Sequence, residues 1–515
     1  MPEPVSPKLV PFAGVTAHAA ALRAQGKRLV QSHGIFDLIH PGHICHLEEA
    51  RALGDVLYVS LTADCHVQKG PGRPYFNEQL RIKSLAALAC VDYVVLVPFP
   101  GATEAIEAIR PHFFCRGKEY EDPAHDPAGS VPAEQRAVAG VGGEFRFIGG
   151  IHFSSTRLLN QYFDHLSAPV KAFCHALAAR YTRQQFTAAV ERLADLRVLV
   201  VGETIFDRYS YVKVQGLTSK NRILSGRFLE RETHCGGALA AFRHVQQFTP
   251  KARFLSVVGT EPWVEALLAE HVPPAADLVE RAAGYTTIVK ERFVEPRREG
   301  QELNKLFAVN YLDAGPASAA VGNEMEARLR EALPSCDAVL LLDFGHGLFS
   351  PALRRQIEAQ APFLALNCQT NSNNHGFNIL SRRYERADAF SLDEQELLLV
   401  AGRRELDLAA ELAALQRQLR ARYAWLTRGP VQTLGLAEGE PPCACPPLET
   451  EVVDAVGAGD AFFSVASLAA ACRLPLDLGT FLGQLAGAQA VRIVGNARPI
   501  ARETLVHSGR SLLNF

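Results

Sequence analysis

The sequence lacks an excess of either charge. It carries 53 Lys and Arg against 55 Asp and Glu, a formal net charge of −2 at pH 7, and no long basic block. This balance gives no reason to expect binding to nucleic acid or to an anionic membrane surface. Apolar runs are short and broken by Asp, Arg, Gly or Pro, so we expect no membrane span. Residues 1–4 show neither a basic n-region nor an apolar h-region, and we expect a cytoplasmic protein.

Repeated CxxC pairs are also lacking. The 11 cysteines are scattered along the chain, and most have apolar neighbours. An odd number in such surroundings favours reduced thiols over disulfides. Cys443 and Cys445 fall in a proline-rich stretch, which predicts a loop. A chain of 515 residues with 48% hydrophobic and 21% charged residues exceeds one ordinary core, so two or three globular domains are expected.

Residues 27–160, after an N-terminal extension at 1–26, alternate short apolar runs with helical patterns. Strands are predicted at 27–32, 55–61, 93–97, 112–115 and 145–148, and helices at 42–53, 77–90 and 103–109. This alternation predicts a doubly wound parallel sheet covered on both faces. Ligands of such sheets bind at the carboxyl ends of the strands, where the first strand runs into His33 and the Pro-Gly turn at 41–42.

The segment His40-Pro41-Gly42-His43 stands at a predicted helix start. Histidines at 33, 40, 43 and 46 could also indicate a metal site, but this turn suits phosphate better than tetrahedral zinc. Two imidazoles at a helix N-terminus can stabilise a phosphate whose charge spreads during displacement. Downstream, Lys69 and Arg73 lie in a Gly-Pro-rich loop, and Arg81 lies on the next helix. A solvated surface charge is the alternative for each of these cations, and for Arg81 alone it is the first expectation.

These residues resemble a known family when five motifs are taken in order. GIFDLIHPGH, KGPGRP, NEQLRIKSLAAL, CRGKEY and SSTR are similar to the HxGH nucleotidyltransferases, and most of all to the adenylyltransferase half of bifunctional heptose kinase/adenylyltransferases. The resemblance implies that His40 and His43 stabilise the α-phosphate of the transition state and that Lys69 binds the triphosphate. It also implies a nucleotide site made by Gly34, Phe36, Asp37, Arg73, Arg81, Arg116, Gly117, Ser154, Ser155 and Thr156. The family usually has Lys where this chain has Arg116, so ATP and CTP both remain open as the nucleotide.

A helical connector is predicted at 161–195. Apolar residues recur about one turn apart, and no Gly/Ser-rich tether interrupts them. One or two helices there would join the domains rigidly or pack at a dimer interface.

Residues 196–515 again alternate strands and helices. Strands are predicted at 197–202, 253–258, 285–294, 338–343, 363–367 and 388–391, with helices at 325–333, 394–401 and 406–422. This predicts a second doubly wound α/β domain, in which a β-rich excursion at 222–232 forms a lid.

The stretch Gly457-Ala458-Gly459-Asp460 is the focus of this second domain. We expect a β-prone approach at 451–453 and a helix over 461–472. The small residues allow close approach to phosphate, and the helix N-terminus adds its dipole. Asp460 in the first turn could take a proton from an attacking hydroxyl. A capped, glycine-rich turn without function is the alternative for this motif alone.

The second domain resembles the ribokinase-like, or phosphofructokinase-B, sugar kinases. Gly236-Gly237 matches the first signature of that family, and 454–460 matches the second. The resemblance implies that Asp460 is the general base, that Gly457, Ala458 and Gly459 form the anion hole, and that Asp207 contacts the sugar together with Gly236 and Gly237. It further implies that Asp393 and Glu396 place Mg²⁺ through water, and that Thr427 and Gly429 hold ATP. Asp393 replaces the usual Asn, Ala240 replaces a frequent Asn, and the domain order is reversed relative to the heptose enzyme.

Together the two resemblances imply a bifunctional enzyme of activated-sugar biosynthesis. One domain would phosphorylate a sugar or sugar phosphate with ATP, and the other would join a sugar 1-phosphate to a nucleotide. The partners implied are small sugar phosphates and nucleotides, and the family suggests a homo-oligomer. A cytidylyltransferase fused to a kinase for another sugar or polyol is the second interpretation, and a non-catalytic binding domain is the third.

Overall fold

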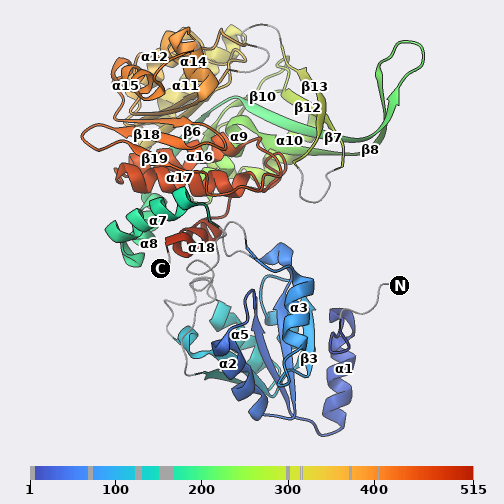
Figure 1. Ribbon diagram of the computed structural model, residues 1–515. Helices are drawn as coiled ribbons and strands as arrows, with labels where there is room; N and C mark the ends of the chain where they lie inside the picture. The colour runs from blue at the N-terminus through green and yellow to red at the C-terminus, as the bar shows by residue number, and fades with distance from the viewer. Residues whose placement is uncertain are drawn as a thin grey trace. The chain divides into compact units, whose positions relative to one another are not determined.

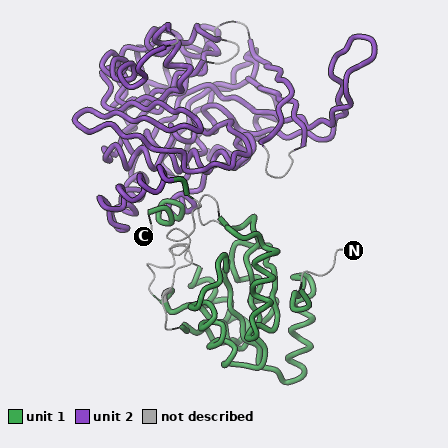
Figure 2. The backbone as a smooth tube through the Cα atoms, viewed as in Figure 1, with its two compact units in different colours: residues 1–167, 507–515 green, residues 168–506 purple. Residues whose placement is uncertain are grey.

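The computed structural model describes residues 6–67, 73–121, 130–149, 166–296, 302–313, 315, 317–370, 374–403 and 405–513. The chain folds into two compact units, residues 1–167 with 507–515 and residues 168–506, which Figure 2 colours separately. Lys69, Ser154, Ser155 and Thr156, all predicted to belong to the nucleotide site, lie outside the described residues.

The first unit is built on the predicted parallel sheet. Its strands lie in the order β3-β2-β1-β4-β5, so the direction of winding reverses between β1 and β4. The five strands are β1 (Leu29–Gly34), β2 (Val56–Thr62), β3 (Tyr93–Val97), β4 (Phe113–Gly117) and β5 (Glu144–Ile148). Ligands of such folds bind beside this reversal, at the carboxyl ends of the central strands. The end of β1 and the end of β4 therefore mark the expected site.

Helices connect these strands. They are α1 (Phe12–Ala24), α2 (Pro41–Ala52), α3 (Glu78–Ala86), α4 (Thr103–Ile109) and α5 (Ser130–Gly140), with short turns η1 (Asp64–His66) and η2 (Lys118–Glu121). Helix α1 lies in the segment expected to be an extension, yet its Val15 and Ala19 share one apolar cluster with Leu29 and Tyr58. Helix α1 is therefore part of the packed unit, since burying these side chains removes apolar area from water.

The second unit contains an eight-stranded sheet. Its order is β19-β18-β17-β16-β15-β14-β6-β9, and β18 and β19 run antiparallel at one edge. The strands are β6 (Val198–Gly202), β9 (Arg253–Leu255), β14 (Ala338–Asp343), β15 (Leu364–Cys368), β16 (Ala389–Asp393), β17 (Tyr423–Thr427), β18 (Thr433–Ala437) and β19 (Cys443–Cys445). The central strands are buried along their whole length, as expected for a sheet with both faces covered.

Helices surround this sheet (Figure 1). They are α7 (Ala168–Arg180), α8 (Arg183–Glu191), α9 (Gly237–Gln246), α10 (Pro262–His271), α11 (Ala319–Ala332), α12 (Pro351–Gln360), α13 (Leu380–Arg383), α14 (Glu394–Ala401), α15 (Leu408–Gln418), α16 (Ala458–Ala471) and α17 (Leu476–Ala490), and α18 (Arg502–Leu513) begins in this unit. Short turns are η4 (Arg192–Asp195), η5 (Pro274–Ala276) and η6 (Leu333–Ser335). Helices α7 and α8 occupy part of the predicted connector and belong to this unit.

The β lid expected from the sequence is a separate four-stranded sheet. Its order is β13-β12-β7-β8, made by β7 (Thr204–Leu217), β8 (Leu224–Gly236), β12 (Ile288–Val294) and β13 (Lys305–Tyr311). A small pair, β10 (Val257–Val258) with β11 (Glu280–Arg281), lies between these elements in sequence. In Figure 1 the β7–β8 hairpin extends well beyond the rest of the unit. The fold class is thus α/β in both units, as predicted.

Two local predictions were wrong. Residues 451–453 form no strand, because Val453 instead donates to the carbonyl of Val491 and accepts from Leu303, at 2.8 and 3.0 Å, outside any ladder. Cys443 and Cys445 do not lie in a loop. They are buried in the edge strand β19, whose pairing with β18 satisfies backbone groups that the proline-rich sequence suggested would face water.

None of the helices among the described residues is long and apolar enough to cross a membrane.

Candidate active sites

The HPGH segment of the first unit forms the start of helix α2. His40 is the residue before the first turn, Pro41 is the first helical residue, and the His40 and His43 rings stack 3.9 Å apart between centroids. Phe36, in a left-handed conformation with φ of 48°, packs edge-on against His43 at 5.2 Å. A Cβ on Gly34 would come within 2.9 Å of the Phe36 ring, so glycine leaves room for this aromatic side chain. The two imidazoles thus stand together at a helix N-terminus, where an anion is favoured.

Three arginines of the predicted nucleotide site are buried and paired with carboxylates. Arg73 lies 2.7 Å from Asp37, whose Oδ1 also accepts from the backbone N–H of Phe76 at 3.0 Å. Arg81 donates to Asp64 at 2.6 Å and to the carbonyl of Thr62 at 2.9 Å. The expectation that Arg81 is a solvated surface charge was therefore wrong, since the residue is 1% exposed.

Arg116 joins the ends of two strands. Its Nε donates to Glu134 of α5 at 2.8 Å, and its Nη1 donates to the carbonyl of His33 at 3.2 Å. His33 is itself bonded to Ser60, and burial, together with the nearby Arg116 charge, lowers its pKa to about 3. Glu134 holds Arg116, and Arg116 holds the backbone of the neutral His33. These contacts fix the carboxyl ends of β1 and β4 beside Gly117, the last residue of β4. The Arg116 guanidinium therefore supports the end of β1, while its charge is balanced by Glu134.

In the second unit, Gly457 and Ala458 begin helix α16. Gly457 is the N-cap residue with φ of +86°, a conformation that favours glycine, and a Cβ there would lie 2.1 Å from the Asn496 side chain. Gly459 and Asp460 follow in the first turn. The helix N-terminus is thus built as predicted from the GAGD spacing.

Asp460 is buried among groups from several other elements. Its Oδ1 accepts from Nε2 of Gln369 at 2.7 Å, directly after β15. Burial raises the pKa of Asp460 to about 7; the Asp207 charge also raises it, while Gln369 and Lys290 of β12 lower it. A general base that works near neutral pH needs a pKa in this range. Gln369 and Lys290 were not singled out from the sequence, although Gln369 follows a buried strand at its carboxyl end.

Asp207 of the lid lies near enough to Asp460 for its charge to act on that carboxylate. Arg292, two residues beyond Lys290 on β12, forms an ion pair with the Asp207 carboxylate. Gly236 lies so close that a Cβ there would come within 2.1 Å of Asp207 Oδ2, and Gly237 starts α9 with φ of +56°. The Gly-Gly motif thus makes room for the Asp207 carboxylate.

Side chains alternate between the two faces of a strand, so Lys290 and Arg292 lie on one face of β12. The sequence could have indicated this shared face.

Asp454 holds the segment that leads into α16. It is fully buried; its Oδ2 accepts from the Tyr209 hydroxyl at 2.7 Å and from the Gly495 N–H at 3.0 Å. Its Oδ1 accepts from Lys305 at 2.6 Å and from the Val456 N–H at 3.1 Å. One carboxylate therefore joins two lid strands and a C-terminal turn to the segment that leads into α16.

Replacing Asp454 by Ala should leave all four donors without their acceptor. Lys305 is partly exposed and can be hydrated, but leaving a buried donor such as the Tyr209 hydroxyl without its acceptor costs about 1–3 kcal/mol, so we expect the free energy of unfolding of this unit to fall by that order. Urea unfolding measures the change, and Asp454→Asn, which keeps one acceptor oxygen, should lose less. A loss below about 1 kcal/mol for the Ala variant would show that the Asp454 carboxylate does not hold these elements together.

Asp393 and Glu396 cap helix α14. Each carboxylate accepts the backbone N–H of the other residue, at 2.8 and 2.9 Å, and Glu396 also accepts from the Thr370 N–H at 2.9 Å. Burial and the Asp393 charge raise the pKa of Glu396 to about 8. Both Glu396 oxygens are thus occupied by backbone donors, which fits binding of Mg²⁺ through water better than direct ligation. Among the described residues no cluster of three His, Cys, Asp or Glu is arranged to hold a metal.

The predicted ATP-binding residues follow the next strand. Thr427 ends β17, and Gly429, with φ of +47°, lies in the turn between β17 and β18. Thr427 and Asp393 are register partners on the parallel strands β17 and β16. Both therefore lie at the edge of the sheet where the strands have their carboxyl ends. The kinase residues predicted from distant motifs are thus gathered along one edge of the sheet.

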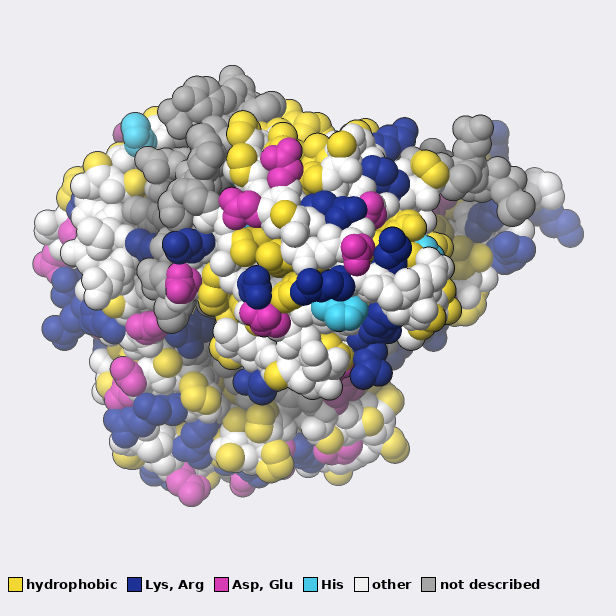
Figure 3. Space-filling model, turned by 90° about the horizontal axis from the view of Figure 1, so that it is seen from below, with side chains coloured by type: hydrophobic (Ala, Val, Ile, Leu, Met, Phe, Trp, Pro, Cys, Tyr) yellow, Lys and Arg dark blue, Asp and Glu magenta, His cyan; other side chains and the backbone are white. Residues whose placement is uncertain are grey.

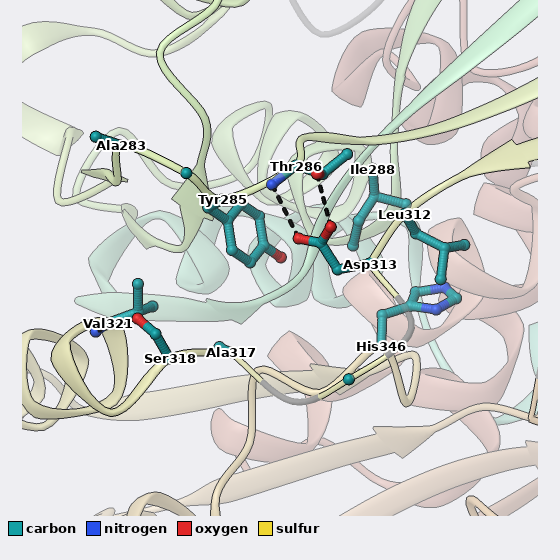
Figure 4. Close-up of a pocket in the computed structure, with 12 residues that line it drawn as sticks. Ala283, Tyr285, Thr286, Ile288, Leu312, Asp313, Ala317, Ser318, Val321 and His346 are labelled. Atoms are coloured by element: carbon teal, nitrogen blue, oxygen red, sulfur yellow. Dashed lines mark hydrogen bonds between the residues drawn. The ribbon is translucent and has the colours of Figure 1, made fainter.

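Glu203, after β6, was not singled out from the sequence. Its oxygens accept from the N–H groups of Phe344 and His346 at 2.6 and 2.9 Å, and burial with the Asp343 charge raises its pKa to about 8. The turn that it holds borders a cleft of about 290 Å³. Figure 4 shows His346 reaching into this cleft opposite Thr286, which donates twice to Asp313. The cleft offers polar groups beside the lid.

Charge on the molecular surface is mixed. On the face shown in Figure 3, Lys and Arg side chains lie interspersed with Asp and Glu. This distribution matches the near-zero net charge of the chain.

Comparison with known proteins finds a family match within the first unit. Residues 32–139 match the family model described as cytidylyltransferase-like. Among curated proteins, the bifunctional protein HldE of Pelobacter propionicus is 39% identical over 149 residues, which cover 28% of this chain and 29% of that protein. HldE of Azorhizobium caulinodans is 44% identical over 106 residues, covering 20% and 22% respectively. The chain thus spans less than a third of the length of these relatives.

Solved kinase structures are similar to the larger part of the chain at low identity. Arabidopsis thaliana ribokinase complexed with ribose and ATP matches with a TM-score of 0.47 and 16% identity, over 62% of this chain and 99% of that one. Phosphofructokinase-2 from Escherichia coli in complex with substrates and products matches with a TM-score of 0.48 and 15% identity, over 60% and 97%.

Proposed function

We propose that the chain is a bifunctional enzyme of nucleotide-activated sugar biosynthesis, acting on a heptose. Its second unit transfers the γ-phosphoryl group of ATP to the anomeric hydroxyl of a sugar or sugar phosphate. Its first unit then transfers a nucleotidyl group to a sugar 1-phosphate and releases pyrophosphate. The observation that carries the proposal is the buried Asp460 carboxylate in the first turn of α16, facing Asp207 and Lys290. A sequence resembling the heptose enzymes in both halves supports the sugar.

In the kinase step, Asp460 accepts the proton of the acceptor hydroxyl. The hydroxyl oxygen forms a bond to the γ-phosphorus, the bond from that phosphorus to the bridging oxygen breaks, and ADP leaves. The N–H groups at Gly457–Gly459 stabilise charge on the phosphoryl oxygens, and Asp207 orients the sugar. Mg²⁺, held through water by Asp393 and Glu396, would neutralise phosphate charge when bound.

In the transferase step, a sugar 1-phosphate oxygen attacks the α-phosphorus of a nucleoside triphosphate. The bond from the α-phosphorus to the bridging oxygen breaks, and pyrophosphate leaves. His40 and His43 donate hydrogen bonds to the α-phosphate as its charge spreads, aided by the N-terminus of α2. The reaction needs a sugar 1-phosphate, so a kinase acting at the anomeric position would supply it.

A substrate screen tests the proposal. Purified protein is incubated with ATP and a panel of heptoses, hexoses and their phosphates, with ADP release measured; ATP and CTP are then compared with sugar 1-phosphates by pyrophosphate release. We expect turnover in both assays, with heptose acceptors preferred and phosphate added at the anomeric carbon. A kinase product phosphorylated elsewhere would separate the two steps, and binding without turnover in either assay would reduce that domain to a binding module.

The second candidate is a cytidylyltransferase fused to a kinase for another sugar or polyol. The cytidylyltransferase-like match and Arg116 in place of the usual Lys favour it. CTP consumption without ATP consumption in the transferase assay would support this alternative. We also propose that the chain assembles as a homo-oligomer, with exposed lid residues such as Leu217 and Phe228 offering apolar surface.

A further inference from the structure

Gln369 links the candidate base to the centre of the sheet. It follows directly after β15, and its Nε2 donates to Oδ1 of Asp460 and to Oδ1 of Asn367, each at 2.7 Å. The residue is also held through its backbone. Its N–H donates to the Asp343 carbonyl at 2.9 Å, and its carbonyl accepts from Asn378 at 2.9 Å.

The direction of these hydrogen bonds is set by a backbone carbonyl. Asn367 Nδ2 donates to the carbonyl of Ser391 at 3.1 Å, and a carbonyl can only accept. The amide oxygen of Asn367 must therefore face Gln369, and an oxygen there requires the NH₂ group of Gln369. Both hydrogens of that group are then used, one toward Asn367 and one toward Asp460. The side-chain amide of Gln369 is thus oriented so that it presents a donor, not an acceptor, to the Asp460 carboxylate.

We propose that Gln369 is a positioning residue for phosphoryl transfer, which holds Oδ1 of Asp460 so that Oδ2 takes the proton of the acceptor hydroxyl. This inference rests on the proposed role of Asp460 as general base. Asn367 acts one step further away, by keeping the Gln369 amide in its donating orientation. Both residues act through the Asp460 carboxylate.

The charges around Asp460 give this contact a second consequence. Asp207 of β7 disfavours the ionised carboxylate, as does burial, whereas Lys290 of β12 and the Gln369 donor favour it. Glu396 of α14 is a further acidic neighbour, since the Asp460 charge contributes to raising the pKa of Glu396. Removing the Gln369 donor leaves Lys290 alone to offset burial and the acidic groups. The pKa of Asp460 should then rise further, and less of the base would be ionised at neutral pH.

The test replaces Gln369 by Met, which has similar length and no donor, and Thr370 by Val as the matched neighbour that does not contact Asp460. Full-length protein labelled with [4-¹³C]aspartate is titrated by NMR, and the Asp460 signal is identified by its absence from Asp460→Asn. We expect the wild-type midpoint to be about 7. In Gln369→Met it should lie about one to two pH units higher, because a hydrogen bond to a charged group contributes about 1.5–3 kcal/mol.

The kinase pH profile supplies the second readout. With the best acceptor from the screen, the acidic limb of kcat/KM should move upward in Gln369→Met by the NMR shift, with a fall of about five- to fiftyfold at pH 7. Asn367→Ala should shift the limb in the same direction by less, and Thr370→Val should leave it in place. An unchanged Asp460 midpoint and acidic limb in Gln369→Met would overturn the inference. A wild-type protein with no kinase turnover would refute the proposed function instead, while the NMR titration would still decide whether Gln369 governs Asp460.

Discussion

Asp460→Asn is expected to lower the kinase rate by about 10²- to 10⁴-fold, the usual contribution of a positioned general base. Asn keeps the shape of the side chain and can still accept from Gln369, so the loss should fall on kcat. Pyrophosphate release by the other unit of the same preparation should be unchanged. ADP release with the preferred acceptor measures the first effect, and full kinase activity in this variant would remove Asp460 from the mechanism.

The stability of this variant separates lost chemistry from lost folding. The pKa of Asp460 is raised from 3.8 to about 7 on folding, so the protein binds a proton as it folds. Stability is therefore lost as pH rises through that interval, and the buried charge remains unfavourable above it. Asp460→Asn should raise Tm at pH 8 relative to the wild type, and less so at pH 5. A variant that is inactive and also less stable at pH 8 would show that the substitution disturbs the fold.

His43→Ala is expected to lower nucleotidyl transfer by about 10²- to 10³-fold, the loss seen when one preorganised donor to a developing charge is removed. The His43 ring stacks on His40 at the start of α2. A methyl group in its place cannot donate the proposed hydrogen bond to the α-phosphate. Kinase activity in the same preparation should be unaffected. Pyrophosphate release with a sugar 1-phosphate is the measurement.

His46→Gln is the matched control for this substitution. His46 lies about one turn further along α2, where its Nε2 bonds to the Ser32 hydroxyl at 2.8 Å, a contact that Gln can also make. We expect His46→Gln to retain most of the transferase rate. Equal losses in the two variants would mean that helix stability, rather than the phosphate contact of His43, controls the rate.

The parts of the site that could be predicted are those that depend on short stretches of sequence. The strand at 338–343 and the helix at 394–401 match β14 and α14. Helix α2 and the glycine at the start of α16 were predicted from a Pro-Gly turn and a GAGD motif, because turns, caps and helix starts depend on neighbouring residues. Predictions that depend on pairing with distant segments were weaker. The run at 451–453 looks like a strand but pairs with no neighbour, since only the tertiary arrangement decides which backbone groups meet.

The sequence by itself determined the two α/β units, the phosphate-binding turns and the residue types able to do the chemistry, because periodicity and local motifs carry that information. The tertiary structure decided which of those residues act on one another. Gln369 reaches Asp460 across 91 positions of the chain, and Arg292 pairs with Asp207 across 85. Arg81, expected at the surface, is buried and pairs with the partly exposed Asp64. Such contacts depend on strand order and on burial, and burial also moves the pKa of Asp460 into the range where a carboxylate can serve as a base.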